Sequence, residues 1–267
     1  MATSINPRPA LPPFSLRPAR RSEQPTLANV YARGFWKDVL FGDYIHPYRE
    51  KYPADNDLYW LRRMQVEWWD WTHRFIVSTV NDEKIGKEIV TGVAHWARLG
   101  PEGAKKYGLR WWDPRRIILP LSHLYTSITS CFFPNRAAHP DLEDVIERAY
   151  PFINPWTGSR EESWYLEWLA VAPEYHGQGH GRALVQWGLD RAKEENICAS
   201  VIAAYGKEKF YENCGFNNTA GTAGQGEGNP LADTPGGVVY FRDVPWESNG
   251  LANGHDSSLT NGLRQKS

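Results

Sequence analysis

Residues 164–182 read WYLEWLAVAPEYHGQGHGR, and this stretch decides the fold. Its first part, residues 164–171, is an almost continuous apolar run, which is typical of a central strand buried on both faces. Pro173 ends the strand because proline cannot donate to a ladder. After three glycines, residues 181–195 place their apolar side chains on one helical face. The stretch therefore predicts a strand, a glycine loop and a helix, in that order.

The glycine loop is suited to bind an anion. Glycine lacks the Cβ atom that keeps a ligand away from the backbone. The start of a helix adds unpaired N–H groups and the positive end of the helix dipole. The loop therefore predicts a phosphate or pyrophosphate site. Its residues are His176, Gly177, Gln178, Gly179, His180, Gly181 and Arg182.

Two common nucleotide-binding motifs do not fit this loop. A P-loop ends in Gly-Lys-Ser/Thr, whereas this one ends in Gly181-Arg182-Ala183. The dinucleotide-binding fingerprint expects an acidic residue about 20 positions further on, at the end of the next strand. The strand predicted over residues 198–204 contains no acidic residue. Both classes of protein are therefore excluded.

Periodicity predicts the remaining elements on either side of this stretch. Strands are expected at 14–17, 75–80, 88–98, 198–204 and 238–242, and helices from Ser22 as N-cap and at 57–71, 141–150 and 207–213. The strands at 75–80 and 88–98 are joined by a polar turn at 81–84, which predicts an antiparallel hairpin. This order of elements predicts a mixed α/β fold.

Seven prolines interrupt residues 99–160. Because proline disrupts the interior of a helix, we expect no long element there and interpret the segment as an insertion that precedes the central strand. We expect one folded domain over residues 14–246. The Pro-rich lead at 1–13 and the polar tail at 247–267 are expected to be disordered, since they have few apolar side chains to bury.

Composition narrows the classes of partner. The net charge of −1 provides no basic surplus for nucleic acid, and no apolar run approaches the roughly 20 residues that span a bilayer. We therefore expect neither nucleic acid nor membrane as a partner. The three cysteines have no zinc-ligand spacing, and their odd number suits reduced thiols in the cytoplasm. No metal is expected, and the sequence leaves the oligomeric state open.

Three blocks of sequence resemble the core of the GNAT superfamily of N-acetyltransferases. They are the end of the strand at 169–173, the glycine loop, and the block FYENCGF at 210–216, in the order and at the separation that this family has. Within the family, Trp164 and residues 186–190 resemble fungal and puromycin-acetyltransferase-like members. The resemblance covers residues 164–216. It implies a mostly antiparallel central sheet flanked by helices.

The resemblance also implies an activity. It implies direct transfer of acetyl from acetyl-CoA to the amine of a small molecule in a ternary complex. Three alternatives stay open: O-acyl transfer, another coenzyme-A-dependent biosynthetic step, and a non-catalytic module that binds the coenzyme. Retention of Tyr211 beside an intact loop counts against the last.

The same resemblance implies roles for individual residues. Leu169, Ala170 and Val171 would offer backbone groups to the pantetheine arm, and the glycine loop would hold the pyrophosphate. The loop departs from the family at His176, where Arg or Gln is usual, so an altered coenzyme affinity is expected. Tyr211 matches the tyrosine that protonates the departing thiolate.

The sequence offers two candidates for the general base. Glu167 is the only charge in the central strand, and a buried carboxyl has a raised pKa that suits a base. A structural, salt-bridged glutamate is the alternative. His95, in the strand at 88–98, is the competing candidate, although it also fits a hydrogen-bonded core histidine.

The chain has thirteen tryptophans, which is well above ordinary usage. Trp60, Met64, Trp68 and Trp71 recur at helical spacing within 57–71 and are expected to pack on the sheet. Three others lie off that stripe or in the insertion, and we hypothesise that they line an acceptor pocket for a flat or apolar molecule. They are Trp69, Trp111 and Trp112.

Overall fold

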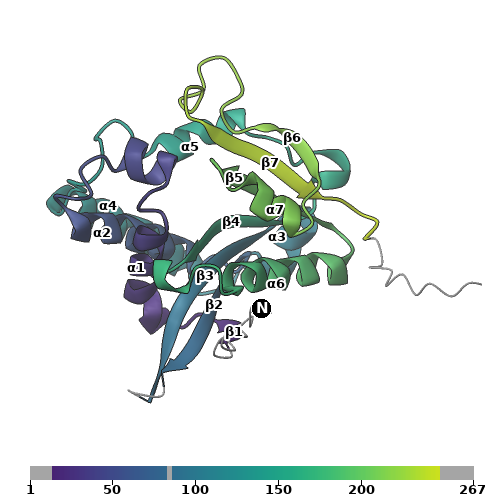
Figure 1. The fold of residues 1–267 in the computed structure, drawn as a ribbon, viewed down its shortest axis with the longest axis horizontal. Coiled ribbons are helices and arrows are strands. Elements are labelled where there is room, and N and C mark those ends of the chain that lie inside the picture. The colour runs from purple at the N-terminus through teal and green to yellow at the C-terminus, as the bar shows by residue number, and fades with distance from the viewer. Residues whose placement is uncertain (1–13, 83–85, 247–267) are drawn as a thin grey trace, which may run out of the picture.

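The computed structural model describes residues 14–82 and 86–246 (Figure 1). The lead at 1–13 and the tail at 247–267, both predicted to be disordered, lie outside the described residues. So do Glu83 and Lys84 of the predicted polar turn.

The described part of the chain forms a seven-stranded sheet in the order β1-β2-β3-β4-β5-β7-β6. The strands are β1 Phe14–Pro18, β2 His73–Asp82, β3 Lys87–Leu99, β4 Ser163–Val171, β5 Cys198–Ala204, β6 Asn218–Thr222 and β7 Gly236–Arg242. Every pair of neighbours is antiparallel except β4 and β5. The prediction of a mixed, mostly antiparallel sheet flanked by helices is confirmed, as is the hairpin of β2 and β3.

Helices occupy the connections between the strands. They are α1 Gln24–Gly34, α2 Pro53–Glu67, α3 Pro101–Tyr107, α4 Arg115–Phe132, α5 Val145–Ala149, α6 His180–Glu195 and α7 Glu208–Asn213, with a π-helix, η2, at Val39–Ile45. Single 3-10 turns lie at Arg21–Glu23, Tyr150–Phe152, Gly158–Arg160 and Pro173–Tyr175. Figure 1 shows α6 running along the sheet, while α1, α2 and α4 gather at one side of the molecule.

Each face of the sheet has its own hydrophobic core. Side chains alternate along β2, so that Phe75 and Val77 join the core made with α1 and α2, whereas Ile76 joins the core made with α6. Trp96 is fully buried in the α6 core, and its indole Nε1 donates a hydrogen bond to the carbonyl of Leu184 at 3.3 Å. The sheet is therefore the middle layer of three.

The parallel pair β4–β5 is incomplete, and this determines where a site can form. Residues 163–166 of β4 pair with residues 198–201 of β5, and the two strands then separate. Beyond Leu166, β4 pairs only with β3, up to Val171 opposite Gly92. The backbone groups of residues 167–171 that face β5 therefore lack a strand partner.

The predicted boundaries of the first two helices need correction. Helix α1 begins at Gln24 after a 3-10 turn, so Ser22 is not its N-cap. Helix α2 spans Pro53–Glu67 rather than 57–71, because Pro53 suits the first helical turn. Trp60 and Met64 are buried as expected, but Trp71 lies beyond the helix with 53% of its surface exposed.

The segment between β3 and β4 also differs from the prediction. An 18-residue helix, α4, runs through Pro120. Pro120 is the sixth residue of the helix and cannot donate to the carbonyl of Arg116, so the helix continues with one main-chain bond missing. The helix expected at 141–150 is reduced to α5, Val145–Ala149. The edge strand β6 was not predicted, since its sequence NTAGT lacks the apolar alternation of a strand.

The close approach of α6 to the sheet predicts one stability effect. A Cβ atom at Gly188 would lie 2.2 Å from the buried ring of Trp96. We expect Gly188→Val to lower the free energy of unfolding by about 1–3 kcal/mol through overpacking, measured by urea denaturation. Lys193→Ala, at an exposed position of the same helix, is the control and should change it by less than about 0.5 kcal/mol. Equal effects of the two substitutions would contradict this packing.

Candidate functional site

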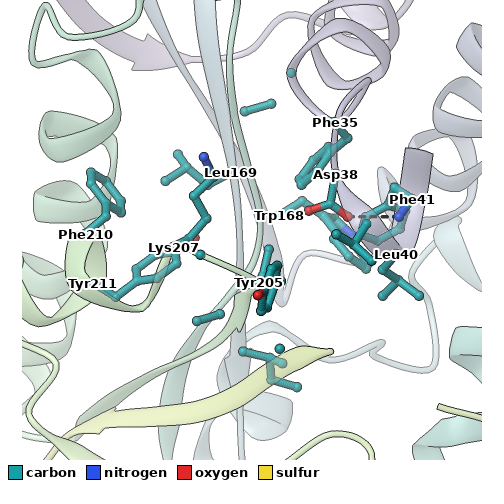
Figure 2. Close-up of a pocket in the computed structure, with 18 of the residues that line it drawn as sticks. Phe35, Asp38, Leu40, Phe41, Trp168, Leu169, Tyr205, Lys207, Phe210 and Tyr211 are labelled. Carbon is teal, nitrogen blue, oxygen red and sulfur yellow. Dashed lines mark hydrogen bonds between the residues drawn. The ribbon is translucent and has the colours of Figure 1, made fainter. Parts of the chain in front are cut away.

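A cavity of about 1200 Å³ lies where β4 and β5 separate. Its walls come from six parts of the chain: residues 33–41, residues 146–153, the ends of β4 and β5, residues 175–182, α7, and the loop before β7. Figure 2 shows Phe210 and Tyr211 on one side and Phe35, Asp38 and Phe41 on the other, with Trp168 and Leu169 of β4 between them. This volume is enough for two ligands that meet where β4 and β5 separate, a place that we call the split.

The glycine loop forms the floor of one end of this cavity. Gly177 and Gly179 have φ angles of 74° and 91°, which favour glycine. The first main-chain bond of α6 runs from the amide of Ala183 to the carbonyl of Gly179. Within the part of the chain that the structure describes, the amides of residues 177–182 therefore have no main-chain acceptor. Free amides at the start of a 16-residue helix make an anion cradle.

The side chains of this loop turn away from the cradle. The His176 Nε2 atom donates to the carbonyl of Val171 at 2.8 Å, and Gln178 Nε2 donates to the carbonyl of Glu174 at 3.0 Å. His180 is buried, with Nδ1 3.0 Å from the hydroxyl oxygen of Thr91. All predicted loop residues except Gln178 line the cavity, as do Leu169, Ala170 and Val171. The amides, rather than the side chains, are thus presented to a ligand, with Arg182 as the nearby cation.

Tyr211 lies on α7 across the split from β4. Its ring is packed edge-on against Phe210, with centroids 5.1 Å apart, and its surface is 9% exposed within the cavity wall. Burial raises the pKa of the Tyr211 phenol above its usual range. At neutral pH this hydroxyl therefore keeps its proton and is able to donate it.

Glu167 lies at a bulge in β4. In the pairing with β3, Trp96 faces Leu166 and His95 faces Trp168, so that Glu167 has no partner across the ladder. A bulge re-aims a side chain, and Glu167 lines the cavity with only 8% of its side chain exposed. The Tyr150 hydroxyl donates to Oε1 at 3.4 Å.

Behind Glu167, the structure brings together two histidines that lie far apart in the sequence. His95 Nδ1 is 3.3 Å from Glu167 Oε2, and His95 Nε2 is 2.8 Å from Nδ1 of His73. His73 Nε2 in turn is 4.0 Å from a carboxylate oxygen of Asp70, which is exposed. The two candidates for the base, Glu167 and His95, are thus neighbours in one chain of polar groups that leads to the surface.

Burial sets the protonation of this cluster. It raises the pKa of Glu167, an effect that the nearby His73 and Arg63 oppose, and it lowers the pKa of His95 well below its usual range. Burial and the charge of Glu167 also raise the pKa of Glu67, whose Oε2 lies 3.5 Å from His95 Nδ1. His95 is therefore neutral at pH 7, and Glu167 takes up a proton more readily than an exposed glutamate.

The ligand types of His73, His95 and Glu167 also suit a metal, and their candidate ligand atoms lie within 4.8 Å of one another. Two nitrogens that bind one Zn²⁺ at 2.0–2.1 Å in a tetrahedral site lie about 3.3 Å apart. The two imidazole nitrogens here are 2.8 Å apart, which is the distance of a hydrogen bond. The geometry therefore favours a shared proton over a shared ion.

Sequence reasoning missed the far wall of the cavity. Phe35, Trp36, Phe41 and Trp168 provide aromatic surface there, and Asp38 adds a carboxyl group. The Asp38 carboxylate accepts the amide of Phe41 at 2.9 Å and so caps η2, while burial raises its pKa. An Asp followed three residues later by an aromatic side chain was the available signal.

The hypothesis that three other tryptophans line this pocket is wrong. Trp111 and Trp112 lie on the surface with 87% and 61% of their area exposed. Trp69 stacks under the guanidinium of Arg21, 4.7 Å from its ring centroid, and does not line the cavity. The part of the segment before β4 that reaches the cavity is Ile146, Tyr150 and Ile153 instead, while α4 packs against α2.

Comparison with known proteins agrees with this fold. Residues 145–218 match the family model described as an acetyltransferase (GNAT) domain. No curated protein matches the sequence. Among the described residues, no helix is long and apolar enough to cross a membrane.

Solved structures are similar to this chain at low identity. A histone acetyltransferase HPA2 and related acetyltransferase from Corynebacterium glutamicum is 16% identical, with 88% of this chain and 98% of that chain covered and a TM-score of 0.50. A mosquito arylalkylamine N-acetyltransferase like 5b is 15% identical over 87% and 100%, with a TM-score of 0.45. The paia N-acetyltransferase from Thermoplasma acidophilum, in complex with coenzyme A, is 12% identical over 87% and 99%, with a TM-score of 0.41.

The glycine cradle predicts a specific effect on ligand affinity. Gly177 has a positive φ, and a Cβ atom there would meet no atom within 4 Å. In Gly177→Ala, backbone strain of about 1–2 kcal/mol would be relieved by rearranging the loop, so we expect the affinity for coenzyme A to fall about tenfold in calorimetry. Gly158→Ala is the control, since Gly158 also has a positive φ and open space but lies outside the cavity. Equal affinities of the two variants would rule out the cradle.

Proposed function

We propose that this protein is an acetyl-CoA-dependent N-acetyltransferase that acts on a small amine with an aromatic or apolar body. Catalysis would take place within a single domain over residues 14–246. The observation that carries the proposal is the separation of β4 from β5 above a loop with free amides. Acetyl-CoA is an extended thioester with a pyrophosphate. The separated strands would bind its arm, and the free amides would bind the charge of its pyrophosphate.

The coenzyme fits the end of the cavity that the glycine loop forms. Amides of residues 177–182 would hold its pyrophosphate, and the backbone of Leu169, Ala170 and Val171 on the side that has no partner in β5 would bind the amide groups of its arm. The bound thioester supplies the acetyl group. Because His176 is bonded to the strand at Val171, it would position the loop rather than contact the phosphate.

Tyr211 is suited to be the general acid. When the amine nitrogen attacks the thioester carbonyl, an N–C bond forms and the C–S bond breaks, so the sulfur leaves as a thiolate. The phenol of Tyr211 would give its proton to that thiolate, since burial keeps the phenol protonated at neutral pH. The proton that the nitrogen loses when it becomes an amide would then restore the phenol.

Glu167 is suited to be the general base. An amine attacks only as the free base, and a simple amine is mostly protonated at pH 7. Glu167 would take up the proton of the ammonium group, helped by its raised pKa. His95 and His73 would then carry that proton toward Asp70 and solvent through the 3.3 Å and 2.8 Å contacts. His95 would thus act behind Glu167 rather than in its place.

The far wall of the cavity supports the choice of acceptor. The carboxyl groups of Asp38 and Glu167 suit an ammonium group, whereas the rings of Phe35, Phe41 and Trp168 suit an apolar or aromatic body. An alcohol would leave both carboxyl groups without a cationic partner, which makes O-acyl transfer the second candidate. Three free cysteines fit a cytoplasmic location, and the likeness to fungal and puromycin-acetyltransferase-like members stays a prediction.

The proposal is tested by thiol release from acetyl-CoA in the presence of matched acceptors. Phenethylamine, butylamine and phenethyl alcohol form a set that varies the ring and the nucleophile separately. We expect the highest kcat/KM for the aromatic amine and the lowest for the alcohol. Failure of the protein to bind acetyl-CoA would refute the proposal, and preference for the alcohol would favour O-acyl transfer.

Loss of the phenol predicts a defect in turnover rather than in binding. We expect Tyr211→Phe to lower kcat by about 10²–10⁴-fold, the usual contribution of a general acid, while the dissociation constant of acetyl-CoA changes little. Tyr48→Phe is the matched control, because Tyr48 is exposed and lies outside the cavity. Unchanged turnover of Tyr211→Phe at saturating substrates would remove Tyr211 from the mechanism.

Glu167 predicts a pH dependence with a defined sign. The base works only when it is deprotonated, and its pKa is raised by burial. The kcat of the wild-type enzyme should therefore fall as the pH drops through a value above the ordinary carboxyl range. Glu167→Gln should be slower by about 10²–10⁴-fold and lack this limb. The exposed Glu161→Gln serves as control; an unchanged acid limb in Glu167→Gln would assign the base elsewhere.

A further inference from the structure

Helix α4 carries its apolar side chains on the outside. Of its polar side chains, Ser122 and Thr126 face the protein instead: the Ser122 hydroxyl donates to the carbonyl of Gln65 at 2.8 Å, and Thr126 is buried. Arg62 of α2 donates to the carbonyl of Thr129 at 3.0 Å. In a helix that only covers a core, the apolar side chains face the protein and the polar side chains face the solvent. Figure 1 shows α4 beside α2 at the edge of the molecule.

The outward residues form one continuous stripe, which we name the α4 face. It consists of Ile117, Leu121, Leu124, Tyr125, Ile128 and Phe132, which are 48–76% exposed. From Ile117 through Leu121, Leu124 and Ile128 to Phe132 the spacings are four, three, four and four residues, and Tyr125 lies four residues after Leu121. These are the spacings of one side of a helix. In the chain, the exposed Phe133 follows the face at one end, and the exposed Trp111 and Trp112 precede it at the other.

The apolar area is larger than a monomer usually exposes. Five aromatic residues of the face and its extensions are 58–87% exposed. At 150–250 Å² for each side chain, they alone present roughly 500–850 Å². The largest apolar patch of a typical monomer is about 300–600 Å², whereas one side of a stable interface buries about 800 Å². The α4 face thus has the area that a stable dimer needs.

We propose that the α4 face binds the same face of a second copy of this chain, with the two α4 helices antiparallel about a two-fold axis. A groove of about 520 Å³ between α2 and α4 lies beside the face and is lined by Leu58, Leu61 and Tyr125 among others. A two-fold axis would bring the protruding rings of one copy to the groove of the other. It would also bring Arg116 near the negative end of the partner helix.

Composition argues against other occupants of the face. Helices that lie on a membrane carry lysine and arginine on their polar side, but α4 contains no lysine and its two arginines, Arg115 and Arg116, are both in its first turn. Arg115 is already paired with Asp113. The chain's own tail at 247–267 offers three leucines and no aromatic side chain, too few to cover the face.

The first experiment is sedimentation velocity of the full chain over a concentration series. We expect a dimer for the wild type and a monomer for Leu124→Asp. Because Leu124 is exposed, the substitution should not itself unfold the monomer, and a cooperative thermal unfolding transition of the variant checks this. Lys193→Asp, which places the same charge on α6, should stay dimeric. A monomeric wild type up to about 100 μM, or a dimeric Leu124→Asp, would overturn the proposal. So would binding of the monomer to phosphatidylserine vesicles.

A second experiment tests the antiparallel arrangement. Leu124 lies at the middle of the face, so two copies of Leu124→Cys would approach one another and form a disulfide on mild oxidation. The native Cys131 is exposed but lies seven residues, or about 10 Å, further along the helix. Its two copies would be too far apart for a disulfide. A Cys131 cross-link in the wild type would contradict the arrangement.

Discussion

The incomplete pairing of β4 with β5 is the constraint on which the rest of the site depends. Four residues of β4 bond to β5, and the strands then separate. An unpaired backbone edge inside a protein must find other hydrogen-bond partners, because an unsatisfied buried amide or carbonyl is costly. The separation of the strands therefore creates a cavity lined by backbone groups that can bind an extended ligand.

Two hydrophobic cores keep the strands in place. The α6 core fixes β4 and β5 where they pair, and the close fit of Gly188 against Trp96 sets the height of α6 and hence of the glycine loop at its start. The core with α1 and α2 holds the other face, including Ala170 of β4. Both sides of the cradle are thus attached to rigid layers. A bulge at Glu167 turns the one charged side chain of β4 into the cavity that results.

The cluster of Glu67, Glu167, His73 and His95 is costly for folding. Burial of carboxyl groups and imidazoles without full partners opposes stability, and two of its atoms, Glu67 Oε2 and His95 Nδ1, have no hydrogen bond in the described part of the chain. Such groups gather at functional sites more often than elsewhere. They lie between the cavity and the surface, where they would offer the proposed base a way to lose its proton between turnovers.

The parts of the site that the sequence predicted are local. The central strand, the glycine loop, α6 and the Tyr211 block each lie within a short stretch with its own periodicity, so their residues could be named in advance. The contact of Glu167 with His73 depends on the register of three strands, and the wall of Phe35, Asp38 and Phe41 lies in a segment without periodicity. Helix α4 was missed because Pro120 lies inside it, where a proline usually ends or kinks a helix.

The most direct measurement is a crystal structure of the protein with acetyl-CoA. The account predicts pyrophosphate oxygens that accept hydrogen bonds from amides of residues 177–182, and a pantetheine arm along residues 169–171. It also predicts a sulfur atom near the Tyr211 hydroxyl. Coenzyme bound outside the split, or a split that stays closed to acetyl-CoA at saturating concentration, would contradict the account.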